Sequence, residues 1–254
     1  MIKTVAIIQA RMGSSRLPGK VMAPIAGKPM LFHVVNRAQQ AKMIDLVVVA
    51  TTVHGDDDAV AAFCSSENIQ CIRGSLDDVL DRYYQAARYF NAEVIVRLTA
   101  DCPLLDPLVI DKVVEAFHQG DFDYAANVVE CTYPDGLDTE AFSRDTLERA
   151  WREAKLKSER EHVTAYILKH PELFHLGSVK HEEDYSGLRW TVDTSRDLEF
   201  VRAVYGYFGV CPFGMHEILD LLRKHPELRE LNADIERNEG YLKSLKEDAQ
   251  VENL

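Results

Sequence analysis

The sequence of 254 residues lacks any stretch near the ~18 consecutive apolar residues of a membrane-spanning helix. Its first residues, MIKTVAIIQARMG, have no long apolar segment and no small-residue cleavage site. We therefore expect no signal peptide, no membrane attachment and a cytoplasmic location. Basic residues are also scarce, with 29 Lys and Arg against 41 Asp and Glu and a formal net charge of −12. This disfavours nucleic acid as a partner, because such binding depends on clustered Lys and Arg.

Cysteines are few and scattered. The five, Cys64, Cys71, Cys102, Cys131 and Cys211, form no CxxC pair. An odd and dispersed set is typical of a reducing compartment, and none has zinc-ligand spacing. We expect small buried side chains at these positions rather than disulfides or a metal site.

The first half of the chain alternates strand and helix patterns. Continuous apolar, β-branched segments indicate strands covered on both faces, as in a parallel sheet. Helical spacing fills the gaps after Pro29 and in the three later intervals. This order predicts an α/β fold with a doubly wound, mainly parallel sheet flanked by helices. The predicted strands are Thr4–Gln9, Leu46–Thr52, Ile69–Ile72 and Glu93–Leu98, and the later helices are Asp57–Ser65, Asp77–Phe90 and Leu108–Phe117.

The second half is less regular. Phe122–Val129 and Phe174–Lys180 resemble strands, and Ser143–Ala154 predicts a helix with Ser143 as its cap. Ser158-x-x-Glu161 and Thr194-x-x-Asp197 have the spacing of capping boxes and predict two further helix starts.

The tail from Gly214 has a charged, helical pattern. No internal repeat, low-complexity linker or domain boundary interrupts the chain. We expect one domain over residues 1–254, with about 212–254 as a helical extension packed on it.

The sharpest local signal follows the first predicted strand, in Gln9-Ala10-Arg11-Met12-Gly13-Ser14-Ser15-Arg16-Leu17-Pro18-Gly19-Lys20. Ligands of open α/β sheets bind at the carboxyl ends of the strands. Glycines let the backbone approach an anion, and the Arg and Lys side chains can neutralise a phosphate. The loop is therefore expected to bind phosphate.

This loop is neither of the two common phosphate-binding motifs. Five residues separate Gly13 from Gly19, and Val21 follows Lys20 where a P-loop has Ser or Thr. A dinucleotide-binding GxGxxG is absent as well.

Two aspartates follow strand-like segments and are candidate metal ligands. Asp101 ends Arg97–Asp101, and Asp193 follows a short strand pattern ahead of the Thr194 cap. Mg²⁺ is typically held by one or two carboxylates together with substrate phosphates. Either residue can instead be a turn former or a helix cap. Asp56, Asp57 and Asp58 most simply begin a helix.

The chain resembles the sugar cytidylyltransferases that make CMP-linked acidic sugars, of the acylneuraminate and 3-deoxy-manno-octulosonate types. The match is closer to their spore-coat polysaccharide branch, and it covers nearly the whole chain with the motifs in order. The matching motifs are IIQARMGSSRLPGK with Gly27-Lys28-Pro29-Met30, Ala50-Thr51-Thr52, Arg73-Gly74-Ser75-x-Asp77-Asp78-Val79-Leu80-x-Arg82, Arg97-Leu98-Thr99-x-Asp101-Cys102-Pro103, Tyr133-Pro134-Asp135-Gly136-Leu137-Asp138-x-Glu140, Arg160-Glu161-His162-Val163-Thr164, Thr191-Val192-Asp193-Thr194 and Arg237-Asn238-Glu239-Gly240-Tyr241.

The resemblance implies a nucleotide-diphospho-sugar transferase fold, Mg²⁺ dependence and a homodimer. It assigns Arg11, Arg16 and Lys20, with Gly13 and Ser14 of the same loop, to the triphosphate. It assigns Asp101 and Asp193 to the metal. The base and ribose are assigned to Ala10, Arg73, Thr99 and Ala100. The second substrate is assigned to Asp135, Asp138, Glu140, Arg160, Glu161 and His162.

The expected reaction is attack by an acceptor oxygen on the α-phosphorus of CTP, with release of pyrophosphate. Arg11, Lys20, Asp101 and Asp193 would be the catalytic residues, because two anionic substrates must meet. The acceptor is a sugar acid or a phosphorylated small molecule. One departure is Ala100-Asp101-Cys102-Pro103, where the sugar-acid enzymes often have a Gly-Asp-Glu-Pro or similar turn.

Two other functions remain open at this point. A glycosyltransferase of similar fold would use a preformed nucleotide sugar and an Asp-x-Asp motif, a spacing that Asp56–Asp58 contains. A non-catalytic nucleotide-binding protein would bind CTP without turnover. His162 is a tempting base, but a lone histidine on a predicted helix is more often packed or hydrogen-bonded.

Overall fold

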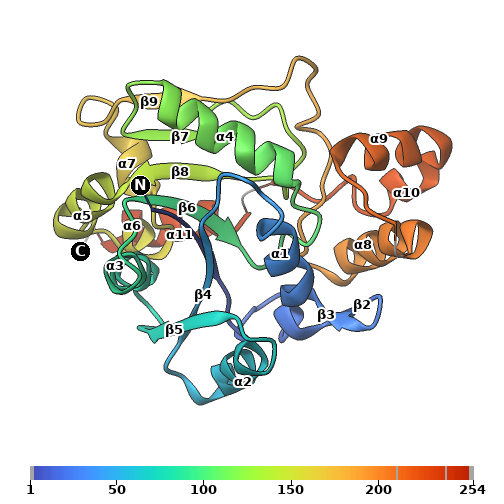
Figure 1. The fold of residues 1–254 in the computed structure, drawn as a ribbon, viewed down its shortest axis with the longest axis horizontal. Helices are drawn as coiled ribbons and strands as arrows, with labels where there is room; N and C mark the ends of the chain where they lie inside the picture. The colour runs from blue at the N-terminus through green and yellow to red at the C-terminus, as the bar shows by residue number, and fades with distance from the viewer. Residues whose placement is uncertain (1–2, 210, 238, 252–254) are drawn as a thin grey trace.

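A computed structural model describes residues 3–209, 211–237 and 239–251. Its centre is a seven-stranded sheet with the order β5-β4-β1-β6-β8-β7-β9, and a two-stranded sheet pairs β2 with β3 (Figure 1). The strands are β1 (Thr4–Gln9), β2 (Pro24–Ile25), β3 (Lys28–Pro29), β4 (Leu46–Thr52), β5 (Gln70–Gly74), β6 (Val94–Thr99), β7 (Tyr124–Ala126), β8 (Glu140–Ser143) and β9 (Leu176–Ser178).

The large sheet is mixed but mainly parallel. Strand β1 lies between β4 and β6, with Ile8 opposite both Val49 and Leu98 in parallel register. Only β8 runs against its neighbours β6 and β7. The fold class predicted from the sequence is confirmed, and the continuous apolar pattern arises because both faces of these strands are covered.

Helices cover the two faces through alternate side chains of the strands. Ala6 and Ile8 pack under α1, α2 and α4, whereas Val5 and Ile7 pack under α3 and α5. The helices are α1 (Met30–Ala38), α2 (Asp58–Ser66), α3 (Val79–Tyr89), α4 (Pro107–Gln119), α5 (Arg144–Glu153), α6 (Lys157–Glu161), α7 (Ala165–Lys169), α8 (Ser195–Phe208), α9 (Met215–Lys224), α10 (Pro226–Glu230) and α11 (Glu239–Val251), with the 3₁₀ turns η1 (Lys20–Met22) and η2 (Gly55–Asp57).

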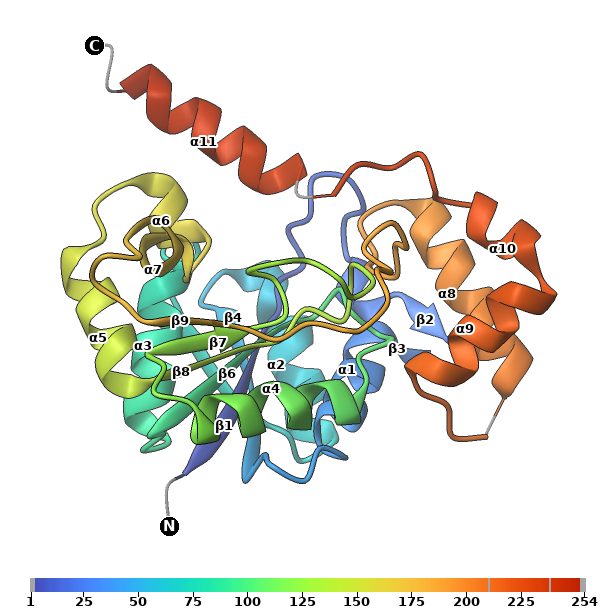
Figure 2. The ribbon, with the colours of Figure 1, turned by 90° about the horizontal axis from the view of Figure 1, so that it is seen from above.

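A third apolar cluster joins the C-terminal helices to the sheet. Trp190 and Phe200 pack there with Ile218 of α9 and Met30 of α1. Figure 2 shows α11 crossing above the carboxyl ends of the strands, from the side of α8–α10 toward α6 and α7. None of the described helices combines the length and apolar character needed to span a membrane.

Several boundaries differ from the sequence prediction. The strands expected at Phe122–Val129 and Phe174–Lys180 shorten to Tyr124–Ala126 and Leu176–Ser178. Strand β8 was not predicted, because four residues ending in a helix cap give too little pattern.

The two predicted capping boxes had different outcomes. The box at Thr194 and Asp197 is confirmed. The box at Ser158 and Glu161 is wrong, because α6 begins one residue before Ser158 and its cap bonds come from Glu159. The strand expected before Asp193 is a single bridge between Asp135 and Arg189.

Candidate active site

The candidate site lies at the carboxyl edge of the parallel strands. Strand β1 ends at Gln9 and leads into the cationic loop, which returns to the sheet at Gly19 and Lys20. Gly19 has φ of 72°, a left-handed conformation that glycine adopts without a Cβ clash. This turn directs Lys20 back toward the ends of β6 and of the Arg189–Asp193 segment.

Lys20 joins the two candidate metal ligands. Its Nζ donates to Asp101 Oδ2 at 2.7 Å, to Asp193 Oδ1 at 2.8 Å and to the Val192 carbonyl at 2.8 Å. Only 8% of Lys20 is exposed. Two aspartates 92 residues apart in the sequence therefore lie around one nitrogen atom.

The charges of this cluster stabilise one another. Burial acts to lower the pKa of Lys20, but the carboxylates of Asp101 and Asp193 outweigh it and raise the pKa above its usual value. Burial likewise acts to raise the pKa of Asp101, but the charge and hydrogen bond of Lys20, with a hydrogen bond from Thr99, lower it to about 2. Lysine and carboxylate are therefore both charged at neutral pH.

Arg189 holds Asp193 through the carboxylate oxygen that Lys20 does not contact. Its Nη2 donates to Asp193 Oδ2, its Nη1 to Asp135 Oδ2 and its Nε to Asp197 Oδ1, each at 2.9 Å. Asp197 also accepts from the backbone of Asp193 and Thr194, as the N3 residue of the capping box in which Thr194 is the N-cap of α8. Since Oδ2 of Asp193 faces Arg189, Oδ1 is the oxygen presented to Lys20.

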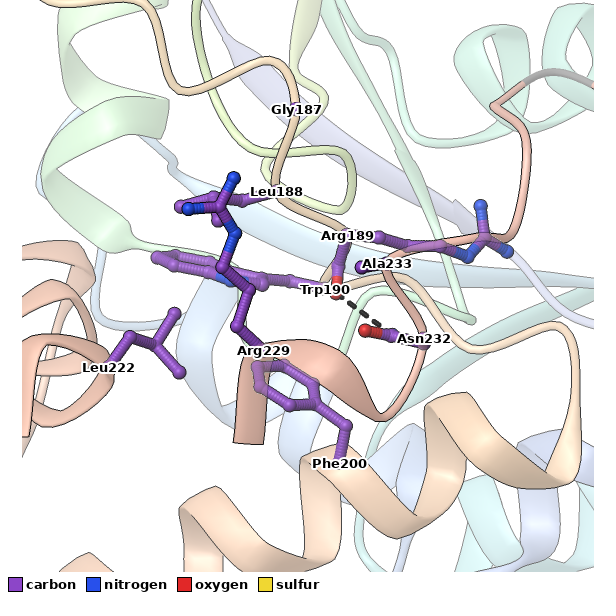
Figure 3. A pocket seen from close by; sticks show the side chains of 9 residues that line it. All are labelled: Gly187, Leu188, Arg189, Trp190, Phe200, Leu222, Arg229, Asn232 and Ala233. Carbon is purple, nitrogen blue, oxygen red and sulfur yellow. Dashed lines mark hydrogen bonds between the residues drawn. The ribbon is translucent and has the colours of Figure 1, made fainter. Parts of the chain in front are cut away.

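A small cavity lies next to Arg189 (Figure 3). It measures about 10 Å³ and is lined by Arg189, Trp190, Asn232 and six other residues, so it has room for about one water and no substrate. Asn232 Nδ2 donates to the Arg189 carbonyl at 3.0 Å and to Asp197 Oδ1 at 2.9 Å. The chain between α10 and α11 thus supports the Asp193 loop.

The remaining loop residues differ in how much of the protein they contact. Arg11 is exposed and makes no hydrogen bond or ion pair among the described residues. Arg16 pairs with Asp193 Oδ1 at 2.9 Å and with Glu239 Oε2 at 2.7 Å. Gly13 has open space around it, and Ser14 Oγ accepts from the Leu17 amide at 3.3 Å.

Asp57 anchors this loop to the sheet. Its carboxylate accepts from the Met12 amide at 2.6 Å and from the Thr52 hydroxyl. The helix expected at Asp56–Asp58 is confirmed, as the turn η2 followed by α2. An Asp-x-Asp motif would use Asp56 and Asp58, and Asp58 already pairs with Arg73 at 2.7 Å while Asp56 lies 3.5 Å from the His54 ring, which disfavours this interpretation of the triplet.

The residues assigned to base and ribose surround the ends of β1, β5 and β6. The Ala10 and Ala100 amides donate to Ala50 and Gln9 carbonyls, both at 3.1 Å. Arg73 Nε donates to the Thr52 carbonyl at 2.7 Å, and Arg73 Nη1 pairs with Asp58 at 2.7 Å. Arg73 thus uses three of its five N–H donors within the protein, and the other two are available to a base.

The loop around Pro134–Glu140, which the family resemblance assigns to the second substrate, is rich in carboxylates. Gly136 has φ of 109°, and a Cβ there would lie 2.5 Å from the Thr191 amide nitrogen, so this loop packs directly on the Asp193 segment. Asp138 accepts from Arg237 Nη2 at 2.7 Å. Burial and the charge of Asp138 raise the pKa of Asp135 to about 7, despite Arg237 and Arg189. Burial also raises the pKa of Asp138.

Two other predicted acceptor residues are committed to internal ion pairs. Glu140 on β8 pairs with Arg97 through one oxygen and accepts from the Tyr124 hydroxyl at 2.8 Å through the other. Arg160 donates from Nε to Asp78 Oδ2 at 2.9 Å. A direct contact between Glu140 and an acceptor would require one of its bonds to break.

Glu161 and His162 lie under the tail helix. Ser244 of α11 is within 2.9 Å of His162 Nε2 and donates to Glu161 Oε2 at 3.1 Å. Burial lowers the pKa of His162, so the ring is neutral at pH 7. The expectation of a hydrogen-bonded rather than free histidine agrees with this geometry.

Sequence reasoning missed Arg189 as a site residue and gave Arg237 no role. Arg189 stands four residues before Asp193. This spacing brings two side chains together in a helix, but the segment is not helical, so the sequence did not predict their contact. Arg237 was noticed only as part of the tail motif, and Asn238 of that motif lies outside the described residues.

The donor set around Lys20 fits a hard divalent cation. Two carboxylate oxygens and a carbonyl oxygen point at one position, and Mg²⁺ prefers such oxygens with substrate phosphates completing its shell. No group of three or more His, Cys, Asp or Glu side chains suited to a metal occurs within the described residues. Protein carboxylates alone would therefore hold such an ion incompletely without nucleotide.

A parallel α/β sheet with a cationic loop after its first strand, facing two aspartates, defines a nucleotide-binding transferase fold. A family model described as "Cytidylyltransferase" matches residues 5–234. The chain belongs to the cytidylyltransferase family.

Individual relatives agree with this assignment. The spore coat polysaccharide biosynthesis protein SpsF of Bacillus subtilis is 36% identical over 87% of this chain and 94% of its own length. A 3-deoxy-manno-octulosonate cytidylyltransferase of Anaeromyxobacter dehalogenans is 43% identical over 45% of this chain and 47% of its own. A solved cytidylyltransferase from Leptospira borgpetersenii is 33% identical, with a TM-score of 0.86, covering 90% of this chain and 97% of that one. The resemblance inferred from the motifs is confirmed.

Proposed function

We propose that this chain is a Mg²⁺-dependent cytidylyltransferase that transfers CMP from CTP to a sugar acid or a phosphorylated acceptor and releases pyrophosphate. The main supporting observation is that Lys20, Asp101 and Asp193 converge at the carboxyl edge of the sheet, where Lys20 ends the loop that begins with the exposed Arg11. The names of SpsF and of the octulosonate enzyme support a role in polysaccharide or glycoconjugate synthesis.

The main obstacle to the reaction is charge, because an anionic acceptor must approach a triphosphate. Arg11, Arg16 and Lys20 offset that repulsion and stabilise the departing pyrophosphate. Gly13 and Ser14 of the same loop also contact the triphosphate, and Ala10 contacts the base and ribose. Arg73, Thr99 and Ala100 lie at the neighbouring strand ends and bind base and ribose.

Asp101 and Asp193 hold the divalent ion, which supplies charge neutralisation at the α-phosphate. Arg189 fixes Asp193 by its second oxygen, and Lys20 engages the triphosphate. The acceptor oxygen bonds to the α-phosphorus as the bond to the β-phosphate oxygen breaks. Holding the two substrates in line supplies much of the remaining acceleration.

The acceptor lies against the carboxylate-rich loop and α6. Asp135, Asp138 and Glu161 accept hydrogen bonds from sugar hydroxyls, with Arg160, His162 and Glu140 supporting this wall through their internal bonds. The protein acts as a cytoplasmic homodimer, with residues 1–254 as one domain. Light scattering coupled to size exclusion tests the dimer.

Pyrophosphate release tests the proposed function. Purified protein with CTP, Mg²⁺ and a panel of sugar acids and sugar phosphates is expected to release pyrophosphate with at least one acceptor, and with CTP in preference to the other nucleoside triphosphates. CTP binding without release across the panel favours a non-catalytic nucleotide-binding protein. Turnover of a nucleotide sugar without free CTP favours a glycosyltransferase.

A further inference from the structure

Lys20 uses its whole hydrogen-bonding capacity on the site itself. An ammonium group has three N–H donors. They are taken by Asp101 Oδ2, Asp193 Oδ1 and the Val192 carbonyl, all within 2.8 Å. In this arrangement Lys20 has no donor left for a phosphate oxygen.

The same three oxygens form the donor set that suits a divalent cation. A carboxylate pair and a carbonyl are hard oxygen ligands. An ammonium and a metal ion cannot both occupy the space between them. Binding of a metal by Asp101 and Asp193 therefore requires Lys20 to move.

The two aspartates depend on Lys20 to different degrees. Asp193 also pairs with Arg16 and Arg189, at 2.9 Å each. Asp101 pairs with no other cation among the described residues, and its other side-chain partners are neutral, namely Thr99 and the Cys102 thiol at 3.7 Å from Oδ1. Lys20 is thus the counter-ion that keeps Asp101 beside a second carboxylate.

Lys20 is also placed to reach a second position. It begins the turn η1, directly after Gly19 and at the end of the loop that contains the exposed Arg11. A lysine side chain has a flexible four-carbon stem. Rotation about that stem moves the ammonium from the carboxylates toward the loop without moving the backbone.

We propose that Lys20 is the resident counter-ion of Asp101 and Asp193 in the nucleotide-free protein and leaves them for the triphosphate when the nucleotide arrives with its divalent ion. Lys20 thereby has two alternating partners. It excludes metal from the free protein and binds phosphate in the complex. This inference rests on the proposed function for the identity of the second partner.

The test measures Mn²⁺ binding to nucleotide-free protein by electron paramagnetic resonance. Lys20→Met removes the competing charge while keeping most of the side-chain volume. We expect Mn²⁺ affinity about ten-fold or more above that of the native protein. Lys28→Met is the matched control, because Lys28 is an exposed lysine paired with Glu67, and its affinity should equal the native one.

Two further variants test whether the gained Mn²⁺ affinity arises at this pair of aspartates. Adding Asp101→Asn to Lys20→Met should abolish the gained affinity if the ion occupies this pair. Lys20→Gln, which places a neutral polar side chain at this position, should also raise Mn²⁺ affinity and replaces Lys20→Met if the methionine variant folds poorly. In either Lys20 variant, Mn²⁺ should raise the melting temperature more than it does in the native protein.

Equal Mn²⁺ affinity in the native protein and in both Lys20 variants would overturn the proposal. A gain that survives Asp101→Asn would also overturn it, since the ion would then bind elsewhere. Because no step of this experiment uses CTP turnover, its failure is separate from failure of the pyrophosphate assay. The inference and the proposed function can therefore fail independently.

Discussion

Two acidic side chains of the candidate site, the half-buried Asp101 and the buried Asp135, have opposite pKa shifts. Asp101, on the proposed nucleotide side with Lys20 and Asp193, has its pKa lowered to about 2 against the effect of burial, because Lys20 donates to it at 2.7 Å. Asp135, on the proposed acceptor side with Asp138 and Glu161, has its pKa raised to about 7 by burial and by the charge of Asp138. Its two cations are shared, Arg189 with Asp193 and Asp197, and Arg237 with Asp138.

This difference separates a charge-balanced region from one with excess negative charge. The nucleotide side has its own cations, of which Arg11 is free to bind phosphate. On the acceptor side, Arg97, Arg160 and Arg237 are already paired with carboxylates of the protein, namely those of Glu140, Asp78 and Asp138. A surface with excess carboxylates suits the hydroxyl or amino groups of an acceptor. We expect the acidic group of the acceptor to face the nucleotide side.

The largest expected effect is on the nucleotide side. Asp101→Asn should lower pyrophosphate release by about a thousand-fold or more, because an amide cannot hold the divalent ion as a carboxylate does. Its melting temperature should stay within a few degrees of native, because Lys20 keeps Asp193 and the Val192 carbonyl.

The matched control is Asp220→Asn on α9, which should retain full activity. Turnover close to native in Asp101→Asn would show that the carboxylate is not needed for the reaction. Collapse of its fold would make Asp101 structural.

A smaller effect is expected from the acceptor side. Asp138→Asn should raise the KM for the acceptor about ten-fold, because the hydrogen bond from an acceptor hydroxyl to the charged carboxylate is lost. The Kd for CTP, measured by calorimetry, should not change.

Arg11→Met should have the opposite pattern of effects. It should weaken CTP binding while leaving the KM for the acceptor nearly native. If each variant changed both constants alike, the division into two sides would be wrong.

The raised pKa of Asp135 predicts a pH dependence of stability. The folded protein binds this proton more tightly than the unfolded chain does, so stability falls as pH rises toward the folded pKa of about 7. Asp135→Asn mimics the protonated form and lacks this loss. The difference in free energy of unfolding between variant and native protein should grow by more than about 1 kcal/mol between pH 4 and pH 8. Urea titrations at several pH values measure it, and a difference independent of pH would contradict the shift.

The smallest effect is expected at His162. Burial lowers the pKa of this ring, which is hydrogen-bonded to Ser244 rather than directed at the nucleotide loop. His162→Gln should therefore change kcat less than about five-fold and leave the pH profile of kcat unshifted. Loss of the acidic limb of that profile, where the rate falls as a base becomes protonated, would instead identify His162 as a general base.

The nucleotide side could be read from the sequence because its signals are local. Its residues follow buried parallel strands, and the carboxyl ends of the neighbouring strands β1 and β6 lie at the same edge of the sheet. The acceptor side depends on antiparallel β8, on Gly136 packing against Thr191, and on tail residues such as Arg237 and Ser244. None of these long-range contacts has a local pattern, which is why Arg189 was missed.

In the proposed complex, the nucleotide triphosphate and its divalent ion bind between the cationic loop and the two aspartates. A crystal structure with CTP and Mn²⁺, with anomalous scattering to locate the metal, tests this arrangement most directly. We expect an anomalous peak bound by Asp101 and Asp193, with Lys20 and Arg11 on the triphosphate. A nucleotide bound at the carboxyl edge with its metal on other residues, or with Lys20 still between both aspartates, would contradict it.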